Sequence, residues 1–323
     1  MASDAHEPSH QAREQAVHTD APPDADIVLS LLAELRAQRY RPSAWARFIA
    51  QSRRIARRTA AIHPPLTRSW RRLALGLTLA EAAALGTEAL IGGATGRAAA
   101  RHATPGAALC LAYTLGDAYV HLGMNHAALG DPLYPTIGAP TSLTLTRSAT
   151  AGLLIGHLLG RARPSTAVLS LALATAVLTD IADGQVARRT GRVTRLGAYL
   201  DAEADLGGAV ALTLTLAARR ALPRWLMAIL LARWLFPFVS AIVAYFGPGI
   251  RAPIGGTTLG RITGAAQVAT LGVALLPERA RRRVARGRAA LHVGLAALLI
   301  ISPCAQFIRF AQTLQAARPE VKR

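Results

Sequence analysis

Apolar residues recur along most of this chain in runs that end at charged residues or at glycine and proline, a pattern typical of helices. The run 289–308 has about the 20 uncharged residues that a clean membrane span needs. The other runs are shorter or interrupted by charge, and comprise 73–96, 105–125, 148–160, 164–179, 206–217, 234–250 and 262–277. Because ionisable groups are costly inside a membrane segment, these interruptions indicate functional groups or a wet cavity.

The first part of the chain follows a different pattern. Residues 1–35 read as a polar tail, without the apolar core of a signal peptide, followed by a short helix. Residues 36–72 hold eleven arginines and no acid. Between the arginines, apolar residues recur at helical spacing, namely Trp45, Phe48, Ile49, Ala56 and Ala60. This pattern predicts an amphipathic helix on an anionic membrane surface; a solvated basic linker and a nucleic-acid arm remain alternatives.

We expect the rest of the chain to form two helical regions and a tail. Residues 73–130 predict an accessory helical hairpin, although Glu81, Glu88 and Asp117 weaken the case for a membrane hairpin. The DPLYPTIGAP segment then breaks the helical pattern, and six candidate helices follow within a membrane domain at 131–310. Residues 311–323 form a basic C-terminal tail. The expected fold is therefore an all-α integral membrane protein.

Composition narrows the class of protein. The 323 residues are 52% hydrophobic and only 17% charged, and the mean hydropathy is +0.29. These values exclude a disordered chain, a disulfide scaffold and an ordinary soluble globule with a charged surface. The net charge of +19 is compatible with nucleic acid or an anionic membrane as partner. The high hydropathy favours the membrane, so no nucleic acid is expected.

Four aspartates between two apolar runs carry the main chemical signal. Asp180 and Asp183 are three residues apart, and Asp201 and Asp205 are four apart, so each pair shares one face of a helix. If the two helices pair antiparallel, the four carboxylates converge near the membrane boundary. Such a cluster repels itself unless cations neutralise it. Oxygen ligands suit Mg²⁺, Mn²⁺ or Ca²⁺, and two ions fit the number of carboxylates.

Arginines beside this cluster indicate a phosphate-rich substrate. We expect Gly184 and Gly197 to bracket a loop that carries Arg188, Arg189, Arg192 and Arg195. Gly184 lets the backbone approach a ligand, and Ala187 leaves room for it. Candidates for binding an acceptor phosphate are Arg195, Arg251 and Arg261, since a guanidinium fork suits phosphate. A basic cytoplasmic loop explains part of this charge without any ligand.

The segment 180–205 resembles the signature of the CDP-alcohol phosphatidyltransferase family, D-x-x-D-G-x-x-A-R, eight residues, then G-x-x-x-D-x-x-x-D. All eight fixed positions match, with the spacing intact. The resemblance implies a six-helix membrane enzyme that uses divalent metal, Mg²⁺ or Mn²⁺, and releases CMP. It implies metal binding by Asp180, Asp183 and Asp201, with Asp205 as a further ligand and as the base that activates the acceptor hydroxyl.

The resemblance also assigns the donor site and extends beyond the signature. It places Gly184, Ala187 and Arg188 at the cytidine diphosphate. PTSLTLTR, ending at Arg147, resembles P-N-x-x-T-x-x-R, with Thr144 in place and threonine for the asparagine. GRITGAAQ, at 260–267, is more distantly similar to G-K-x-x-T-x-x-Q. Members of the family are often homodimers, so the resemblance implies a second copy of the chain as a candidate partner.

The leading hypothesis is a multi-pass membrane enzyme of phospholipid synthesis with its site at the cytoplasmic face, at the cell membrane if the source is prokaryotic. It would transfer a phosphatidyl-type group from a CDP-activated lipid, CDP-diacylglycerol by preference, to a small alcohol with or without a phosphate group. A soluble CDP-alcohol donor with a lipid acceptor is the alternative, and a transporter or scaffold is the rival outside catalysis. One feature conflicts with this topology. Six helices after residue 140 place the loop 278–288 on the outer side, whereas its many arginines favour the cytoplasmic side.

Overall fold

The computed structural model describes residues 31–128, 130–246, 258–276 and 292–301, together with residues 280, 283, 287 and 290. Every regular element in these residues is a helix. The helices are a short one at 31–37, α3 (Pro42–Ile62), α4 (Pro64–Ile91), α5 (Gly93–Val120), the 3₁₀ turn η1 (Leu122–Met124), α6 (Ala139–Leu159), α7 (Thr166–Thr190), α8 (Arg195–Ala218), α9 (Arg224–Phe246), α10 (Thr258–Leu275) and a last one at 292–301.

Local sequence signals explain where the helices near the aspartates begin and end. The side chain of Ser165 caps α7 by accepting a hydrogen bond from the Val168 N–H, and Thr194 caps α8 in the same way through the Gly197 N–H. Helix α7 ends at Thr190 and is capped by Gly191, whose φ of 63° lies in the left-handed region that glycine adopts at low cost. Four residues therefore turn the chain from α7 into α8.

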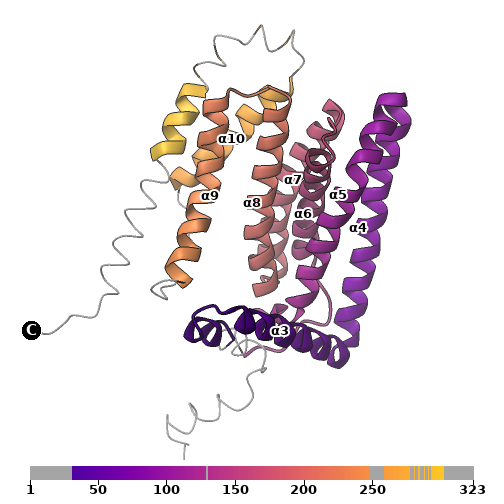
Figure 1. Cartoon of the computed structure of the whole chain (residues 1–323), viewed down its shortest axis with the longest axis vertical. Helices are drawn as coiled ribbons and strands as arrows, with labels where there is room; N and C mark the ends of the chain where they lie inside the picture. The colour runs from indigo at the N-terminus through magenta and orange to yellow at the C-terminus, as the bar shows by residue number, and fades with distance from the viewer. Residues whose placement is uncertain are drawn as a thin grey trace, which may run out of the picture.

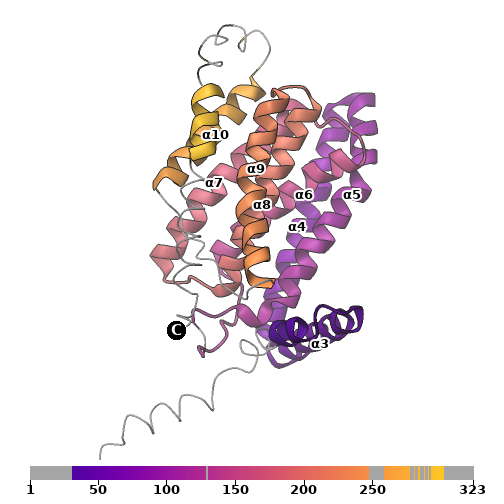
Figure 2. The same ribbon diagram turned by 60° about the vertical axis from the view of Figure 1, so that its left-hand side comes forward.

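The long helices lie side by side and α3 crosses one end of them (Figure 1). Figure 2 shows the same arrangement from another direction, with α3 transverse to the bundle. Helix α6 occupies the centre, where it packs against α5, α7 and α8. Helix α3 contacts η1, and η1 contacts α8, so α3 lies at the end of the bundle where α7 turns into α8.

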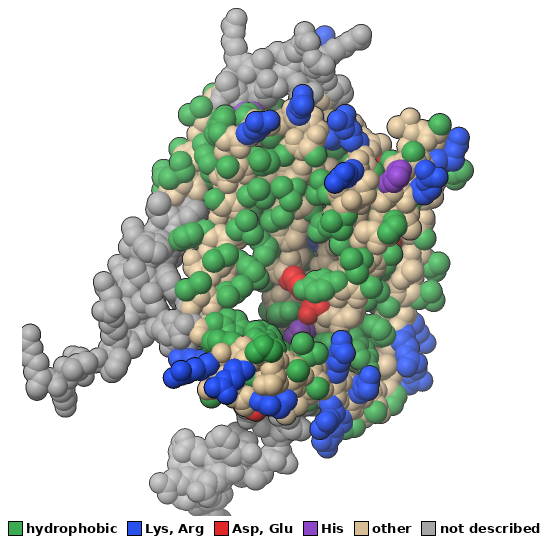
Figure 3. Space-filling model, viewed as in Figure 1, with side chains coloured by type: hydrophobic (Ala, Val, Ile, Leu, Met, Phe, Trp, Pro, Cys, Tyr) green, Lys and Arg blue, Asp and Glu red, His purple; other side chains and the backbone are tan. Residues whose placement is uncertain are grey.

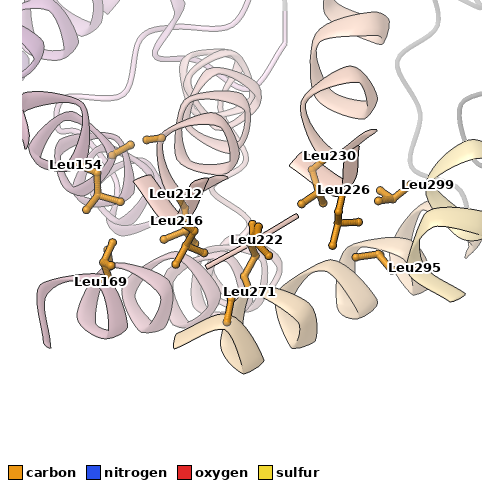
Figure 4. Close-up of a cluster of buried hydrophobic side chains, with 14 residues drawn as sticks. Leu154, Leu169, Leu212, Leu216, Leu222, Leu226, Leu230, Leu271, Leu295 and Leu299 are labelled. Carbon is orange, nitrogen blue, oxygen red and sulfur yellow. The ribbon is translucent and has the colours of Figure 1, made fainter. Parts of the chain in front are cut away.

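A leucine-rich core holds the C-terminal helices together. Its buried side chains come from α6 to α10 and from 292–301, and Figure 4 shows Leu169, Leu212 and Leu271 from three of these helices meeting in one cluster. A second cluster joins α4, α5, α6 and α8, and includes Leu77 and Leu145. Helix α6 contributes to both clusters, so the N-terminal hairpin and the C-terminal bundle share one core.

Helices α5 and α6 approach one another closely along a row of small residues. Gly152, Gly156 and Gly160 are spaced one turn apart on α6 and at its end. A Cβ on Gly156 would lie 2.5 Å from the Ala107 backbone nitrogen, and one on Gly160 would lie 2.1 Å from a carbonyl oxygen of α5. Small residues in this spacing let the backbones of membrane helices touch. The hairpin is therefore tightly docked onto the helix that also carries part of the site.

A buried ion pair ties the hairpin to α6 and α7. Glu88 of α4 accepts at Oε2 from His157 Nε2 at 2.8 Å and at Oε1 from the Ser165 N–H at 3.1 Å. Glu88 is 7% exposed and His157 is fully buried. This pairing shows how an acidic residue that weakened the prediction of a membrane hairpin is accommodated inside it.

Three of the described helices are long and apolar enough to cross a membrane: Pro64–Ile91, Thr166–Thr190 and Arg224–Val243. Figure 3 shows basic side chains gathered toward the two ends of one face, with hydrophobic side chains between them. The all-helical membrane fold expected from the sequence is confirmed, and the segment after residue 138 contains α6 to α10 and the helix at 292–301.

Several details differ from the sequence-based prediction. Helix α4 begins at Pro64, so the boundary expected at 72/73 falls inside it, and α3 covers only part of the arginine-rich segment. Of the run 289–308 the structure describes the apolar helix His292–Ile301, and residues 302–308 lie outside the described residues, so the span expected there stays a prediction. Helices α6, α7 and α8 extend past the charged residues that bounded the apolar runs, because those residues have partners within the bundle. Most of the loop 278–288, and the tails at 1–30 and 311–323, lie outside the described residues.

Candidate active site

Four aspartates from two helices surround one arginine of a third. The guanidinium of Arg147, on α6, lies 3.1 Å from Asp180 Oδ1 and 3.2 Å from Asp183 Oδ2, both on α7. It also contacts Asp201 and lies 3.3 Å from Asp205 Oδ1, both on α8. The predicted convergence of the four carboxylates is therefore observed, and the cation at its centre belongs to the chain itself.

The carboxylates differ in their access to the surroundings. Arg147 is 3% exposed and Asp183 is 11% exposed, whereas the side chains of Asp180, Asp201 and Asp205 are 61%, 44% and 37% exposed. The cluster thus has a buried floor and an open side from which a ligand can reach three carboxylates.

Three of the aspartates have the geometry of a site for a hard cation. Asp180, Asp183 and Asp201 each offer a carboxylate oxygen within 4.8 Å of the other two. Oxygens that share one ion at about 2.0–2.6 Å lie within such distances of each other, and all-oxygen sites suit Mg²⁺, Mn²⁺ or Ca²⁺. Asp205 is not part of this group of three, although it shares Arg147 with them. The residues present therefore fit a divalent ion.

The glycines of the signature lie inside helices, which corrects the expected loop. Gly184 belongs to α7 and Gly197 to α8, and only residues 191–194 connect the two helices. A Cβ on Gly197 would lie 3.0 Å from Thr141 Oγ1 and 3.1 Å from Thr194 Oγ1. Gly197 thus lets α8 pack closely on α6 at the position where threonine replaces the asparagine of the family pattern.

The donor-site candidates lie on the same two helices as Arg147 and the first aspartate pair. Thr144, one turn before Arg147, is 2% exposed, and its hydroxyl lies 3.5 Å from Asp183 Oδ2. Arg188 is exposed near the end of α7, and its guanidinium folds back to 3.3 Å from a Cβ placed on Gly184. Ala187 is half-buried on the same turn.

The acceptor-site candidates are not brought together by the described residues. Arg195 is half-buried at the first position of α8, and its backbone N–H donates to the His126 carbonyl at 3.0 Å. Arg251 lies outside the described residues, and of Arg261 the structure describes the helix but not the side chain. Arg192 stacks over the Tyr134 ring, with 5.7 Å from Cζ to the ring centre.

Sequence reasoning did not assign a role at the site to Arg147, although it retained that residue in the PTSLTLTR pattern. The spacing of Thr144 and Arg147 was the available signal, since residues three apart share a helix face. It also missed the link between Arg233 and Gln267, in which Arg233 Nη1 donates to Gln267 Oε1 at 2.7 Å. That contact joins α9 to α10 and gives the GRITGAAQ segment a structural partner.

A second polar cluster lies between the end of α5 and α8. His121 Nδ1 lies 3.2 Å from Asp117 Oδ1, and the Tyr199 hydroxyl donates to the same oxygen at 3.2 Å. His121 follows the last residue of α5. Burial opposes the charge on His121, but the hydrogen bond and the negative charge of Asp117 outweigh it and raise the pKa of His121 above its ordinary value. The pair is a hydrogen-bonded structural contact.

The fold and the site are those of an all-helical membrane protein in which two aspartate pairs on neighbouring helices meet and fit a divalent ion. The sequence profile of the CDP-alcohol phosphatidyltransferase family matches residues 138–302, just over half of the chain. The chain belongs to the CDP-alcohol phosphatidyltransferase family. Searches of curated protein sequences and of solved structures found no match.

Proposed function

We propose that this protein transfers a phosphatidyl-type group from a CDP-activated lipid, CDP-diacylglycerol by preference, to the hydroxyl of a small alcohol, with release of CMP. The observation that carries the proposal is the meeting of the four signature aspartates around the buried Arg147. Membership of the family supports the reaction class. The donor and acceptor are the finer part of the proposal.

Each residue of the site would have a defined task. Asp180, Asp183 and Asp201 would hold a divalent ion, Mg²⁺ or Mn²⁺, with Asp205 adding a contact to a second one; when bound, such ions neutralise the charge of a diphosphate. Asp205 would accept the proton of the acceptor hydroxyl. Gly184, Ala187, Arg188 and Thr144 would line the place of the cytidine diphosphate, because the first three share α7 with Asp180 and Asp183 and Thr144 lies beside Asp183 from α6.

The reaction forms one bond and breaks one. The deprotonated acceptor oxygen attacks the phosphorus that carries the lipid, the bond from this phosphorus to the bridging oxygen breaks, and CMP leaves with the electron pair. A phosphorylated acceptor would find its phosphate partners among Arg195, Arg251 and Arg261, since arginine forks pair well with phosphate. We place the site at the cytoplasmic face of a multi-pass protein, and a homodimer is the proposed assembly.

The test is CMP release by purified protein from CDP-dioleoylglycerol with Mg²⁺ or Mn²⁺. Glycerol 3-phosphate, inositol phosphate, inositol and serine are compared as acceptors. Asp205→Asn should lower acceptor-dependent release by about 10²- to 10⁴-fold, the usual contribution of a general base. Asp131→Asn is the matched control, because it makes the same change at an aspartate outside the four-aspartate cluster. The Asp131 carboxylate accepts from the Ala128 N–H in the loop before α6.

Each result has a clear consequence. Release that depends on one acceptor and is lost in Asp205→Asn supports the proposal and names the substrate. Release that is unchanged in Asp205→Asn contradicts the role of Asp205. Release only from a soluble CDP-alcohol with diacylglycerol as acceptor supports the alternative donor. No release with either kind of donor, from folded protein, contradicts the transferase.

A further inference from the structure

A groove of about 560 Å³ runs along the side of the bundle, apart from the aspartate cluster. Helix α4 forms one wall, α7 forms the other, and α6 forms the floor, with the first turns of α5 at one end. The groove is open to the surroundings of the helices, because Ile91 and Leu171 line it and are 83% and 64% exposed. Both walls are candidate membrane spans, so this opening faces the depth of lipid chains.

Most of the atoms that line the groove are apolar, although several of the lining residues are polar. Thr146 and Thr150 donate their hydroxyls to carbonyl oxygens one turn earlier on α6, both at 2.9 Å, so these donors are already paired within the helix. The carboxylate of Glu88 is bound by His157 and by the Ser165 N–H. Two charged residues also line the groove: Glu81, whose Oε2 is buried without a hydrogen-bond partner among the described residues, and the exposed Arg163. Alanines and leucines make up much of the remaining wall.

The groove leads toward the aspartate cluster. Val168, Ala172 and Thr175 line it from α7, and the same face of α7 continues through Thr179 to Asp183 at helical spacing. Asp180 is five residues beyond Thr175, about 7.5 Å of helix rise. On α6, Thr146 lines the groove and its neighbour Arg147 holds the four carboxylates.

We infer that this groove binds one alkyl chain of the CDP-activated lipid donor, which deepens the proposed function and rests on it. The groove is lined mostly by apolar atoms, opens toward the lipid chains and continues along α7 toward the aspartate cluster, as an alkyl chain attached to a diphosphate at that cluster requires. Because α4 lies outside the segment that matches the family, this chain site is built in part by the N-terminal hairpin.

The first experiment narrows the groove and varies the length of the donor chains. Ala84→Phe places a ring in the α4 wall, and Ala83→Phe places the same ring on the neighbouring exposed position that does not line the groove. The catalytic efficiency of CMP release is compared for CDP-diacylglycerol with eight-carbon and with eighteen-carbon chains. In Ala84→Phe the catalytic efficiency with the long-chain donor should fall about tenfold relative to that with the short-chain donor. This is roughly the effect of displacing two methylenes from the groove.

Ala83→Phe should keep the wild-type ratio of the two donors. Ala80→Phe, at an exposed position of the same wall, repeats the test if Ala84→Phe does not fold. The inference would be overturned if the two groove variants lost catalytic efficiency equally with both chain lengths. It would also be overturned if Ala83→Phe showed the same selective loss with the long-chain donor.

The second experiment does not depend on turnover. Wild-type protein in nanodiscs is irradiated with CDP-diacylglycerol that carries a diazirine at the end of one chain, and the crosslinked peptides are mapped. We expect crosslinks to α4 and α7 residues of the groove, reduced by unlabelled CDP-diacylglycerol but not by phosphatidylglycerol. Crosslinks elsewhere, or equal competition by phosphatidylglycerol, overturn the inference. CMP release with crosslinks elsewhere refutes the groove alone, whereas groove crosslinks without CMP release refute the reaction alone.

Discussion

Arg147 contacts all four signature aspartates from a position that is almost completely buried. Its positive charge offsets the mutual repulsion of the four carboxylates. The same positions are those from which a divalent ion would be held, so Arg147 and an ion act on the same charges. The arginine therefore stabilises the cluster in the absence of metal.

The first prediction is that Arg147→Met destabilises the protein by about 3 kcal/mol, at the lower end of the range for a broken buried ion pair because three of the carboxylates are partly exposed. Thermal unfolding in detergent measures the loss. Addition of Mg²⁺ should raise the midpoint more in the variant than in the wild type, since the ion replaces the missing charge.

Arg189→Met is the control, because this arginine is exposed at the end of α7. It should unfold as the wild type does, with and without Mg²⁺. A Mg²⁺ response of Arg147→Met that is no larger than that of the wild type would contradict the role of Arg147 as a stand-in for the ion.

The second prediction concerns pH. Since the pKa of folded His121 is raised by Asp117 against the effect of burial, its stabilising contribution is fully present below the unfolded value, about 6.5, and is lost as the pH rises through the folded value. The difference in unfolding midpoint between wild type and His121→Gln should therefore be larger at pH 5.5 than at pH 9. The exposed His102→Gln should show no such trend. A difference in unfolding midpoint between wild type and His121→Gln that grows toward pH 9 would contradict the raised pKa of His121.

At the level of the helices, the contact between α5 and α6 depends on the absence of side chains. The third prediction is that Gly156→Ala is destabilising. The new Cβ would lie 2.5 Å from the backbone nitrogen of Ala107 and 2.7 Å from the Cβ of Ala107, and a backbone cannot give way as a side chain can. We expect a cost of about 1–3 kcal/mol in thermal unfolding. Gly207→Ala in α8 is the matched control, since nothing lies within 4 Å of its Cβ position. It should be neutral or stabilising by up to about 1 kcal/mol.

The buried link between α4 and α6 is tested in a fourth prediction. Glu88→Ala should cost about 3–5 kcal/mol, because it leaves His157 and the Ser165 N–H without their partner in the core. Glu88→Gln keeps hydrogen-bonding capacity and should cost less. The double variant Glu88→Ala, His157→Ala should be less destabilised than the sum of the two single variants. Simple additivity in thermal unfolding would show that the two residues do not act as a pair.

For the whole molecule, the arrangement of the helices predicts which segments share a side of the membrane. Helix α3 and the α7–α8 turn lie at one end of the bundle, and α9 begins at the other end (Figure 1). In a variant without its native cysteines, Arg54→Cys and Arg192→Cys should react with an impermeant maleimide in inside-out vesicles. Arg224→Cys should react only in right-side-out vesicles. Labelling of all three from one side would contradict the transmembrane arrangement.

The amino-acid sequence by itself determined the class of this protein and which acidic residues make up the candidate site. Helical spacing is a local property, so Asp180 and Asp183, or Asp201 and Asp205, could be assigned to one face without knowledge of the fold. The apolar runs likewise indicated a helical membrane protein. Their ends were predicted poorly, because a charged residue that finds a partner in the bundle does not end a helix, as Asp180 and Arg147 show.

Only the tertiary structure decided what surrounds these residues. Arg147 is 33 positions from Asp180 and 54 from Asp201, and no periodicity along the chain relates residues so far apart. The Glu88–His157 pair, the close contact of α5 with α6 and the groove between α4 and α7 likewise depend on which helix faces pack together. Helix packing is chosen by the shapes and volumes of both partners at once, and for that reason it cannot be read from either segment alone.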